Sequence, residues 1–509
     1  MRWQTAAQAV REALQASIPQ TWKLQPSHKD GLQDVTKVPG TCGLLSEQDP
    51  SITDLDASTL VDKIARGELT ATRVTEAFCA RAAIAHQLKA LERVRELDEH
   101  LKMTGKPVGP LHGLPIALKD SYDVPGHATT WGYAFNTSHR ATRESASPQA
   151  GLLLETVSNL YGRTLDPRDT TFGAGGSSGG DGALVALKGR PMTPSTDIGG
   201  SIRAPAAFNG LYGIRLTADQ VPKRGMKSVE SGQLNIRVSC GPVANSLADA
   251  RYDPTCIPVP WREVDLQGEK LAFGLWEWDG AVMPHPPIIR AMRETAEKLK
   301  EAGHEVIPVK MPYDCWEASQ VYMDIYYQYG NEDSAVLLAK AGENIMPAYH
   351  KMLDVYKVPQ IPIDAKQLLK LIQTQSKYRE LLAEAWDATS SQTKTGRSIG
   401  GIICPVSSVA GYPHDFLPWW GYTSLFNLVD YPSTVIPVKG FKITPEKDPK
   451  DEGYIPQDNY FDRSCQNIYD PLRWANMPVC VQIVARPFDD EELIAVTEVL
   501  DGVINGKTE

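Results

Sequence analysis

The chain has 509 residues, of which 42% are hydrophobic and 22% charged, a composition that is ordinary for a large globular protein with a substantial core. Its formal net charge of −10 argues against a nucleic-acid partner and against an anionic membrane surface. No segment approaches the ~20 consecutive apolar residues of a membrane-spanning helix. No apolar run follows residues 1–4 either, so we expect no secretory signal.

Cysteine and histidine usage limits the chemistry further. The eight cysteines are scattered singly without a C-x-x-C pair, so we expect neither a disulfide framework nor a zinc site. The ten histidines show no spacing typical of metal ligands, and no cofactor is implied. We therefore expect a cytoplasmic protein that needs no metal and no cofactor. Nothing in the sequence decides the oligomeric state, which leaves a homodimer open.

The N-terminal part of the chain has helical patterns. Apolar spacing over 3–18 predicts a helix, which we expect to belong to an N-terminal helical arm formed by residues 1–50. Asp56 and Thr70 are typical first residues of two further helices with core-facing apolar positions. Another helical pattern runs over 91–101.

Strand and helix patterns alternate in the second half of the chain. A strand over 271–276, a helix over 286–303 and a strand over 306–309 predict a β-α-β unit with neighbouring parallel strands. Further expected elements are a helix over 364–388, strands over 402–405, 433–438 and 479–484, a polar surface excursion over 446–470, and a last helix that Asp489 and Glu492 begin as a capping box. This alternation predicts one α/β body around a mixed sheet.

Two clusters rich in glycine and serine stand out in the middle of the chain. GGSSGG occupies 175–180 and DIGGS occupies 197–201. Glycine lets the backbone take positive φ and approach a ligand closely, so clusters of this kind indicate a site built with the main chain. Two serines beside exposed N–H groups point to a nucleophile and an oxyanion hole.

Together with their flanking residues, the clusters resemble the signature of the amidase signature family of serine hydrolases. The matching segments are GGSSGG and TDIGGSIRAPAAFNGLYG, and the Ala-Phe-Asn run at 207–209 is similar to that of fungal acetamidases. The resemblance implies the amidase signature fold, an α/β fold whose mostly parallel sheet is covered by helices on both faces. It also implies an amidase domain over 51–509 with a signature core at 110–250. The implied reaction is hydrolysis of small, acetamide-like carboxamides to a carboxylic acid and ammonia.

The resemblance further implies a Ser-cisSer-Lys triad. Lys119 ends a strand candidate at 114–120 and matches the family's catalytic-lysine motif, Pro-[apolar]-x-x-Lys-Asp. A lysine with a pKa of about 10.4 in water must lose several units through burial before it can act as a general base. Lys119 would then accept a proton from Ser177, which accepts one from Ser201. The Ser201 oxygen would attack the amide carbon and form an acyl-enzyme.

The remaining roles are carried over from the family in the same way. The peptide bond before Ser177 is expected to be cis. The expected oxyanion-hole N–H groups are those of Ile198, Gly199, Gly200 and Ser201. The expected supporting residues are Ser178 and Thr196, whose hydroxyls would orient the lysine and the serines, and the ion pair Asp197 and Arg203.

Three other interpretations compete for the first cluster. Residues 175–179 fit G-x-S-x-G, the nucleophile elbow of an α/β-hydrolase, but that motif needs a buried strand directly before it, and 166–170 is turn-like. A phosphate-binding loop would end in G-K-[ST], which does not follow here. Plain flexible loops explain GGSSGG alone but not its combination with TDIGGSIRAP.

The chain looks short beside the family pattern in three places, after Leu88, after Ser147 and after Ala250. At the second place, family members carry a further helix and strand that end in a Lys-Thr-Asn loop. We therefore expect core elements to be missing, either because the chain is a trimmed paralogue or because its reading frame has lost coding segments. The alternative function is that of a catalytically inactive homologue.

Overall fold

The structure, a computed structural model, describes residues 3–25, 32–85, 114–115, 130, 132–137, 156–220, 235–246, 262–330, 342–343 and 347–506. Three features of the sequence lie outside these ranges. They are the helix expected over 91–101, the part of the strand candidate that carries Lys119, and the residues around the three short places.

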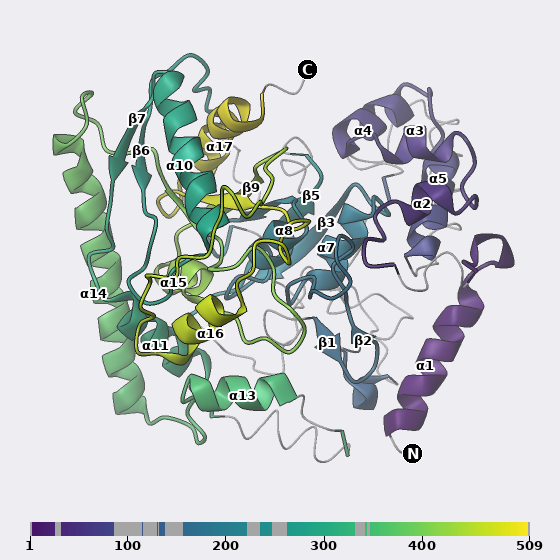
Figure 1. Ribbon diagram of the computed structural model, residues 1–509, viewed down its shortest axis with the longest axis horizontal. Helices are drawn as coiled ribbons and strands as arrows, with labels where there is room; N and C mark the ends of the chain where they lie inside the picture. Colours follow the sequence, from purple (N-terminus) through teal and green to yellow (C-terminus); the bar gives the residue numbers. More distant parts are fainter. Residues whose placement is uncertain are drawn as a thin grey trace.

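Within the described ranges, eight strands form one sheet in the order β3-β5-β4-β9-β10-β8-β6-β7. Figure 1 shows β6 and β7 towards one end of this sheet and β3 and β5 towards the other. In chain order these strands are β3 (Met192–Asp197), β4 (Tyr212–Arg215), β5 (Ser239–Ala244), β6 (Ala272–Leu275), β7 (Glu305–Pro308), β8 (Gly401–Cys404), β9 (Ser433–Pro437) and β10 (Cys480–Val484). A separate antiparallel pair consists of β1 (Val157–Ser158) and β2 (Gly162–Arg163).

The large sheet is mixed, as expected, and most of the pairs between its described strands are antiparallel. β6 pairs in parallel with β7 and with β8. The pairs β8–β10, β10–β9, β9–β4, β4–β5 and β5–β3 are antiparallel. The reason is the strand order. β3 and β4 run in the same direction but β5 lies between them, and β10 lies in the same way between β8 and β9. Helical crossovers therefore join parallel strands that are not adjacent, while a later strand pairs antiparallel with both.

Helices pack on both faces of this sheet (Figure 1). One face carries α10 (Pro286–Glu301) and α17 (Asp490–Asn505); the other carries α8 (Arg203–Phe208), α11 (Cys315–Tyr326), α14 (Ala365–Ala388) and α15 (Gly421–Val429). Successive strand residues point to opposite faces. Accordingly, Ile403 of β8 belongs to the core under α10 and α17, while Ile402 and Cys404 belong to the opposite core.

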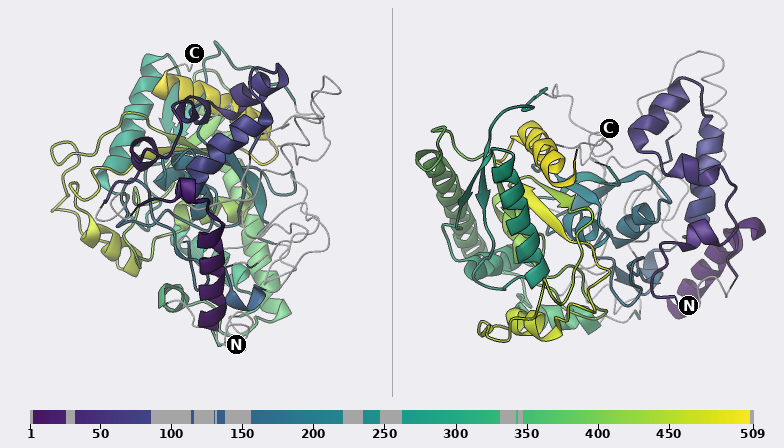
Figure 2. Two further views of the ribbon diagram at one scale, coloured as in Figure 1. Left: turned by 90° about the vertical axis from the view of Figure 1, so that its right-hand side faces the viewer. Right: turned by 45° about the horizontal axis from the view of Figure 1, so that its top comes forward.

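The other described helices include an N-terminal group that lies to one side of the sheet (Figure 2). This N-terminal group consists of α1 (Trp3–Ser17), α2 (Val38–Thr41), α3 (Asp49–Thr53), α4 (Ala57–Ala65) and α5 (Ala71–Ile84). The remaining described helices are α7 (Gly179–Ala186), α13 (Pro347–Val355) and α16 (Tyr460–Ile468), and there are single 3-10 turns at Gln20–Trp22, Ala134–Asn136 and Thr389–Ser391. In the part of the chain that the structure describes, no helix is both long and apolar enough to cross a bilayer.

Local signals in the sequence explain several of these helices. The Asp56 side chain accepts a hydrogen bond from the Thr59 N–H at 2.7 Å and begins α4. Thr70 does the same for α5. Asp364 and Gln367 form a full capping box at the start of α14. The predicted helices over 3–18, from Asp56, from Thr70, over 286–303 and over 364–388 are all confirmed, and so is the β6-α10-β7 unit.

Two local expectations are wrong. Asp489 precedes α17, but its side chain makes no capping hydrogen bond, and Glu492 pairs instead with the Arg262 guanidinium at 2.8 Å. The polar stretch over 446–470 is not a plain surface excursion, because α16 lies within it and buries Phe461. The buried Asp462 carboxylate of α16 accepts hydrogen bonds from several donors around it, so a polar sequence can be held inside the molecule here.

Candidate active site

Ser177 lies in a loop just before α7, and the Gly176–Ser177 peptide bond is cis, as expected. The Thr156 hydroxyl fixes this loop. It lies 3.0 Å from the Gly175 carbonyl oxygen and 3.2 Å from that of Ser177, and it accepts a 2.9 Å hydrogen bond from the Gly179 N–H. One side chain therefore contacts the backbone on both sides of the cis peptide.

Helix α7 and the loop before it are attached to both elements that flank the second cluster. Asp181 of α7 accepts a 3.0 Å hydrogen bond from the Ser195 hydroxyl of β3. Asn209, which follows α8, donates to the Ala174 carbonyl in the loop at 2.9 Å. Gly175 has a φ of +77°, and a Cβ atom there would lie 3.0 Å from the backbone of α8. The first cluster is thereby packed directly against β3 and α8.

The second cluster forms the turn between β3 and α8, and its backbone is wound around one carboxylate. Asp197 ends β3 and accepts hydrogen bonds from the Gly200 N–H at 2.9 Å and the Ile202 N–H at 3.1 Å. The Arg203 N–H contacts the same carboxylate at 3.4 Å. Charge-assisted hydrogen bonds of this kind are strong, so the half-buried Ser201 lies in a turn whose path is fixed by Asp197.

Asp197 and Arg203 form the expected ion pair, and both side chains are fully buried. The guanidinium donates to the carboxylate twice, through Nε at 3.0 Å and Nη2 at 2.9 Å. Its other contacts are with the Thr423 carbonyl (3.1 Å), Gln482 Oε1 (3.2 Å) and Asn427 Oδ1 (2.5 Å). Burial alone would raise the pKa of Asp197, but the charge and hydrogen bonds of Arg203 outweigh burial and hold that pKa well below its usual range. The carboxylate therefore stays ionised under the turn.

The Gly200 N–H is expected to line an oxyanion hole, but in the structure it already has a hydrogen-bond partner. It donates to Asp197 Oδ1, so the carboxylate competes for the hydrogen that a developing oxyanion would need. The N–H groups of Ile198, Gly199 and Ser201 remain as candidates. The sequence could not distinguish these four groups, because the distinction depends on how each peptide plane is turned.

Two hydroxyl groups from distant helices contact the carbonyl oxygens of the same turn. Tyr322 of α11 donates to the Ile198 carbonyl at 3.1 Å, and Thr423 of α15 donates to the Gly199 carbonyl at 2.7 Å. Both side chains are buried. The Asp197 carboxylate therefore binds N–H groups of the turn, while hydroxyls from α11 and α15 bind its carbonyl groups.

The hydroxyl residues expected at the site differ in how much of their surface is exposed. Ser178 and Thr196 are buried, whereas Ser177 and Ser201 are half-buried and so keep part of their surface accessible. Lys119 lies outside the described residues. The structure thus brings both serine clusters together on β3, α7 and α8.

Sequence reasoning missed five residues that hold these clusters: Thr156, Tyr322, Thr423, Asn427 and Gln482. Gln482 had a usable signal, since a single amide within the apolar strand β10 must find a buried partner. The other four carry no such signal, because each belongs to a segment whose place beside the clusters is set only by the fold.

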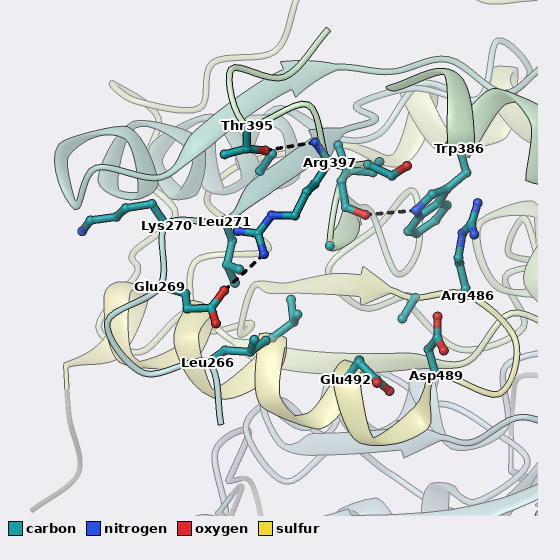
Figure 3. Close-up of a pocket in the computed structure, with 16 residues that line it drawn as sticks. Leu266, Glu269, Lys270, Leu271, Trp386, Thr395, Arg397, Arg486, Asp489 and Glu492 are labelled. Atoms are coloured by element: carbon teal, nitrogen blue, oxygen red, sulfur yellow. Dashed lines mark hydrogen bonds and ion pairs between the residues drawn. The ribbon is translucent and has the colours of Figure 1, made fainter. Parts of the chain in front are cut away.

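A separate open hollow lies beside the start of β6 and the residue before β8 (Figure 3). Arg397 pairs there with Glu269 at 3.5 Å, and the Trp386 indole donates to the Ile399 carbonyl. Its side chains carry charges of both signs, and none of its lining residues belongs to the two clusters. The serine clusters, and not this hollow, are therefore the candidate active site.

The chain matches a protein-family model described as Amidase in two segments, residues 73–147 and 146–494. The segments together contain Lys119 and both serine clusters. They overlap at 146–147, beside one of the places where the sequence looks short.

Curated fungal proteins are similar over nearly the whole chain. An amidase of Gibberella zeae is 45% identical, covering 99% of this chain and 100% of its own length. An acetamidase of Emericella nidulans is 35% identical (97% of each chain), and one of Aspergillus oryzae is 34% identical (97% of this chain, 98% of its own). The first alignment runs over 545 positions, more than the 509 residues of this chain, so that relative has residues without a counterpart here.

Solved structures confirm the expected fold. A fatty acid amide hydrolase superposes with a TM-score of 0.89 at 27% sequence identity, covering 98% of this chain and 95% of its own. A bacterial aryl acylamidase of the amidase signature enzymes superposes with a TM-score of 0.63 over 89% of this chain and 96% of its own. At 20% identity, the second likeness concerns the fold alone.

Proposed function

We propose that this chain, which belongs to the amidase family and is a hydrolase of amides, acts on small carboxamides such as acetamide. The observation that carries the choice of substrate is its 35% identity to an acetamidase over 97% of each chain. The reaction would cleave the C–N bond of the amide and give a carboxylic acid and ammonia.

The proposed mechanism uses Ser201 as the nucleophile. Its oxygen attacks the amide carbon as Ser201 gives its proton to Ser177, and Ser177 gives its own proton to the uncharged amine of Lys119. The lysine ammonium then returns a proton through the relay to the leaving nitrogen as the C–N bond breaks, which releases ammonia and leaves an acyl group on Ser201. Water finally attacks this ester and restores the serine. The packing of both clusters on α8 supports the relay, since it brings the two serine-bearing loops to the same helix.

The carbonyl oxygen of the substrate gains negative charge during the attack and needs fixed donors. We assign this role to the N–H groups of Gly199 and Ser201, with that of Ile198 as a further donor. Loss of one such donor typically costs about 3–4 kcal/mol of transition-state stabilisation. The Gly200 N–H has another role in this proposal, because its bond to Asp197 stabilises the turn itself.

The experiment is ammonia release from acetamide by the purified chain. We expect activity in the unmodified chain and a loss of about 10³-fold or more in the Ser201→Ala and Lys119→Ala variants. The Ser390→Ala variant is a matched control, because it removes a serine hydroxyl that donates to the Asp387 carbonyl at the end of α14 at 2.7 Å and belongs to neither cluster. Equal rates near zero in the unmodified chain and both triad variants would favour the inactive homologue.

A series of linear amides tests the size of the substrate. If the preferred substrate is small, kcat/KM falls as the acyl chain grows from acetamide through hexanamide to a long-chain fatty amide. A rise along this series would instead place the substrate preference nearer to that of a fatty acid amide hydrolase, while the amide-hydrolysing function would stand.

A further inference from the structure

Two hydroxyl side chains outside the signature segments hold the carbonyl groups of the turn that precedes Ser201. Tyr322 donates through Oη to the Ile198 carbonyl at 3.1 Å, and Thr423 donates through Oγ1 to the Gly199 carbonyl at 2.7 Å. Their helices, α11 and α15, pack against each other (Figure 1). The two donors therefore come from one packed unit.

Because the peptide unit is planar, the hydrogen bonds to the Ile198 and Gly199 carbonyls also fix the directions of the N–H groups that follow them. A trans peptide is planar, and its C=O and N–H point in opposite directions. A fixed Ile198 carbonyl therefore fixes the direction of the Gly199 N–H, and a fixed Gly199 carbonyl fixes that of Gly200. The second peptide is held at both ends, because the Gly200 N–H donates to Asp197. The first is held at its carbonyl by Tyr322, and its N–H is one that the proposed function gives to the substrate oxygen.

The two hydroxyl groups occupy the positions that side chains on Gly199 and Gly200 would take. A Cβ atom on Gly199 would lie 2.6 Å from the Tyr322 oxygen, and one on Gly200 would lie 2.5 Å from the Thr423 oxygen. Both distances are too short for a carbon–oxygen contact, so glycine at these positions is what lets the hydroxyls reach the carbonyls. Gly200 also has a φ of +130°, which other residues rarely adopt.

Both side chains are suited to act as fixed donors. Burial raises the pKa of the Tyr322 phenol well above 10, so it keeps its proton, and its ring stacks on that of Tyr326 with a centroid distance of 5.8 Å. The Thr423 oxygen also lies 3.1 Å from the Trp420 carbonyl. A hydroxyl has only one proton to donate, and the shorter contact of 2.7 Å assigns it to Gly199.

We propose that Tyr322 and Thr423 are positioning residues for amide hydrolysis: Tyr322 aims the Gly199 N–H at the oxygen that becomes negative in the transition state, and Thr423 holds the next peptide so that the turn before Ser201 keeps the path that this N–H needs. The inference rests on the proposed function and deepens it, because it adds two residues that lie in the second half of the chain. Neither residue touches the substrate; both act through the turn. Misdirected N–H groups weaken binding of the transition state more than binding of the substrate.

The test measures kcat and KM for acetamide in the Tyr322→Phe and Thr423→Val variants, per active site as titrated with a fluorophosphonate. We expect kcat to fall about 10- to 100-fold, since a small misplacement of catalytic groups can cost about 100-fold, while KM changes less than about twofold. The Thr423→Ser variant keeps the hydroxyl and should recover most of the lost kcat.

Matched controls remove the same kind of hydrogen bond elsewhere in the core. The Tyr469 hydroxyl donates to the Asp448 carbonyl at 2.7 Å, and the Thr497 hydroxyl donates to the Leu493 carbonyl at 2.7 Å. Both residues are buried and lie in other segments. The Tyr469→Phe and Thr497→Val variants should lose thermal stability but keep kcat.

The proposal is overturned if the Tyr322 and Thr423 variants keep the kcat of their controls and differ only in thermal midpoint. If Tyr322→Phe does not fold, the comparison of Thr423→Val with Thr423→Ser decides, and equal kcat values for these two count against the proposal. Failure of the proposed function looks different. In that case the unmodified chain would release no ammonia, or Ser201→Ala would be as active as the unmodified chain.

Discussion

Replacing Arg203 by methionine removes the cation that faces Asp197 and tests how far the buried ion pair stabilises the turn. Both side chains are fully buried, and the closest N–O distance is 2.9 Å. The substitution leaves a buried carboxylate that still accepts the Gly200 and Ile202 N–H groups but has lost its bidentate partner. Removing one member of a buried pair typically costs about 3–5 kcal/mol, so we expect the free energy of unfolding to fall by that amount.

A double-mutant cycle with Asp197→Asn isolates the pair. The asparagine needs no counter-charge, so the Asp197→Asn/Arg203→Met double variant should be about 1–3 kcal/mol more stable than the sum of the two single losses implies. The assay is urea unfolding followed by tryptophan fluorescence, with activity on acetamide measured on the same samples. We expect kcat to fall in all three variants, because the turn before Ser201 is wound around the carboxylate.

The control is an exposed ion pair of similar geometry. Arg293 pairs with Glu277 at 2.6 Å, but the Arg293 side chain is 65% exposed. Its replacement by methionine should therefore cost less than about 1 kcal/mol. The reasoning is refuted if Arg203→Met and Arg293→Met cost the same, or if the two losses in the cycle simply add.

Three further changes test other parts of the account. Between pH 7.5 and pH 5 the unmodified chain should lose about 2 kcal/mol more stability than the His285→Phe variant, as measured by urea unfolding at each pH. The reason is that burial lowers the pKa of His285 from 6.5 to about 4 in the folded state, so the unfolded chain takes up the proton first as the pH falls; parallel pH profiles would contradict this. Thr156→Val should lower the free energy of unfolding by about 1–3 kcal/mol and kcat at least tenfold, because the Gly179 N–H loses its acceptor. Thr156→Ser should restore both quantities, and an unchanged kcat in Thr156→Val would argue against a role in the site. Gly200→Ala should lower the free energy of unfolding by about 2 kcal/mol or more and remove most of the activity. The reason is that Gly200 has a φ of +130° and that a Cβ atom there would lie 2.5 Å from the Thr423 oxygen. A thermal midpoint equal to that of the unmodified chain would contradict this.

Helix starts could be predicted because their causes are local. Asp56 and Thr70 lie within three residues of the N–H groups that they accept, so the sequence alone contains the whole interaction. Asp489 shows the limit of this reasoning. The expected capping box is replaced by a pair between Glu492 and Arg262, which lies far away in the sequence.

Strand order could not be predicted in the same way. The patterns at 402–405 and 433–438 correctly predict the strands β8 and β9, but not the helix α15 between them, and the two strands run in the same direction. The insertion of β10 between them depends on a segment that follows after a long excursion, and no periodicity reports it. The same holds for β5 between β3 and β4.

The two serine clusters could be found from the sequence because glycine and serine at fixed spacing are themselves the signal. Their supports could not. Tyr322 and Thr423 lie in ordinary helices, and only the folded chain shows that their hydroxyls reach the Ile198 and Gly199 carbonyls. The same holds for the Gly200 N–H, which donates to Asp197 and not into the expected oxyanion hole, since the sequence does not report the direction of a peptide plane.

Covalent labelling with a fluorophosphonate, followed by mass spectrometry of the labelled peptide, tests the proposed nucleophile most directly. A fluorophosphonate phosphonylates an activated serine oxygen and releases fluoride, so the label marks the nucleophile itself. We expect a single phosphonate on Ser201 and its loss in the Ser201→Ala variant. A phosphonate on Ser177, or an unlabelled chain that still releases ammonia from acetamide, would contradict it.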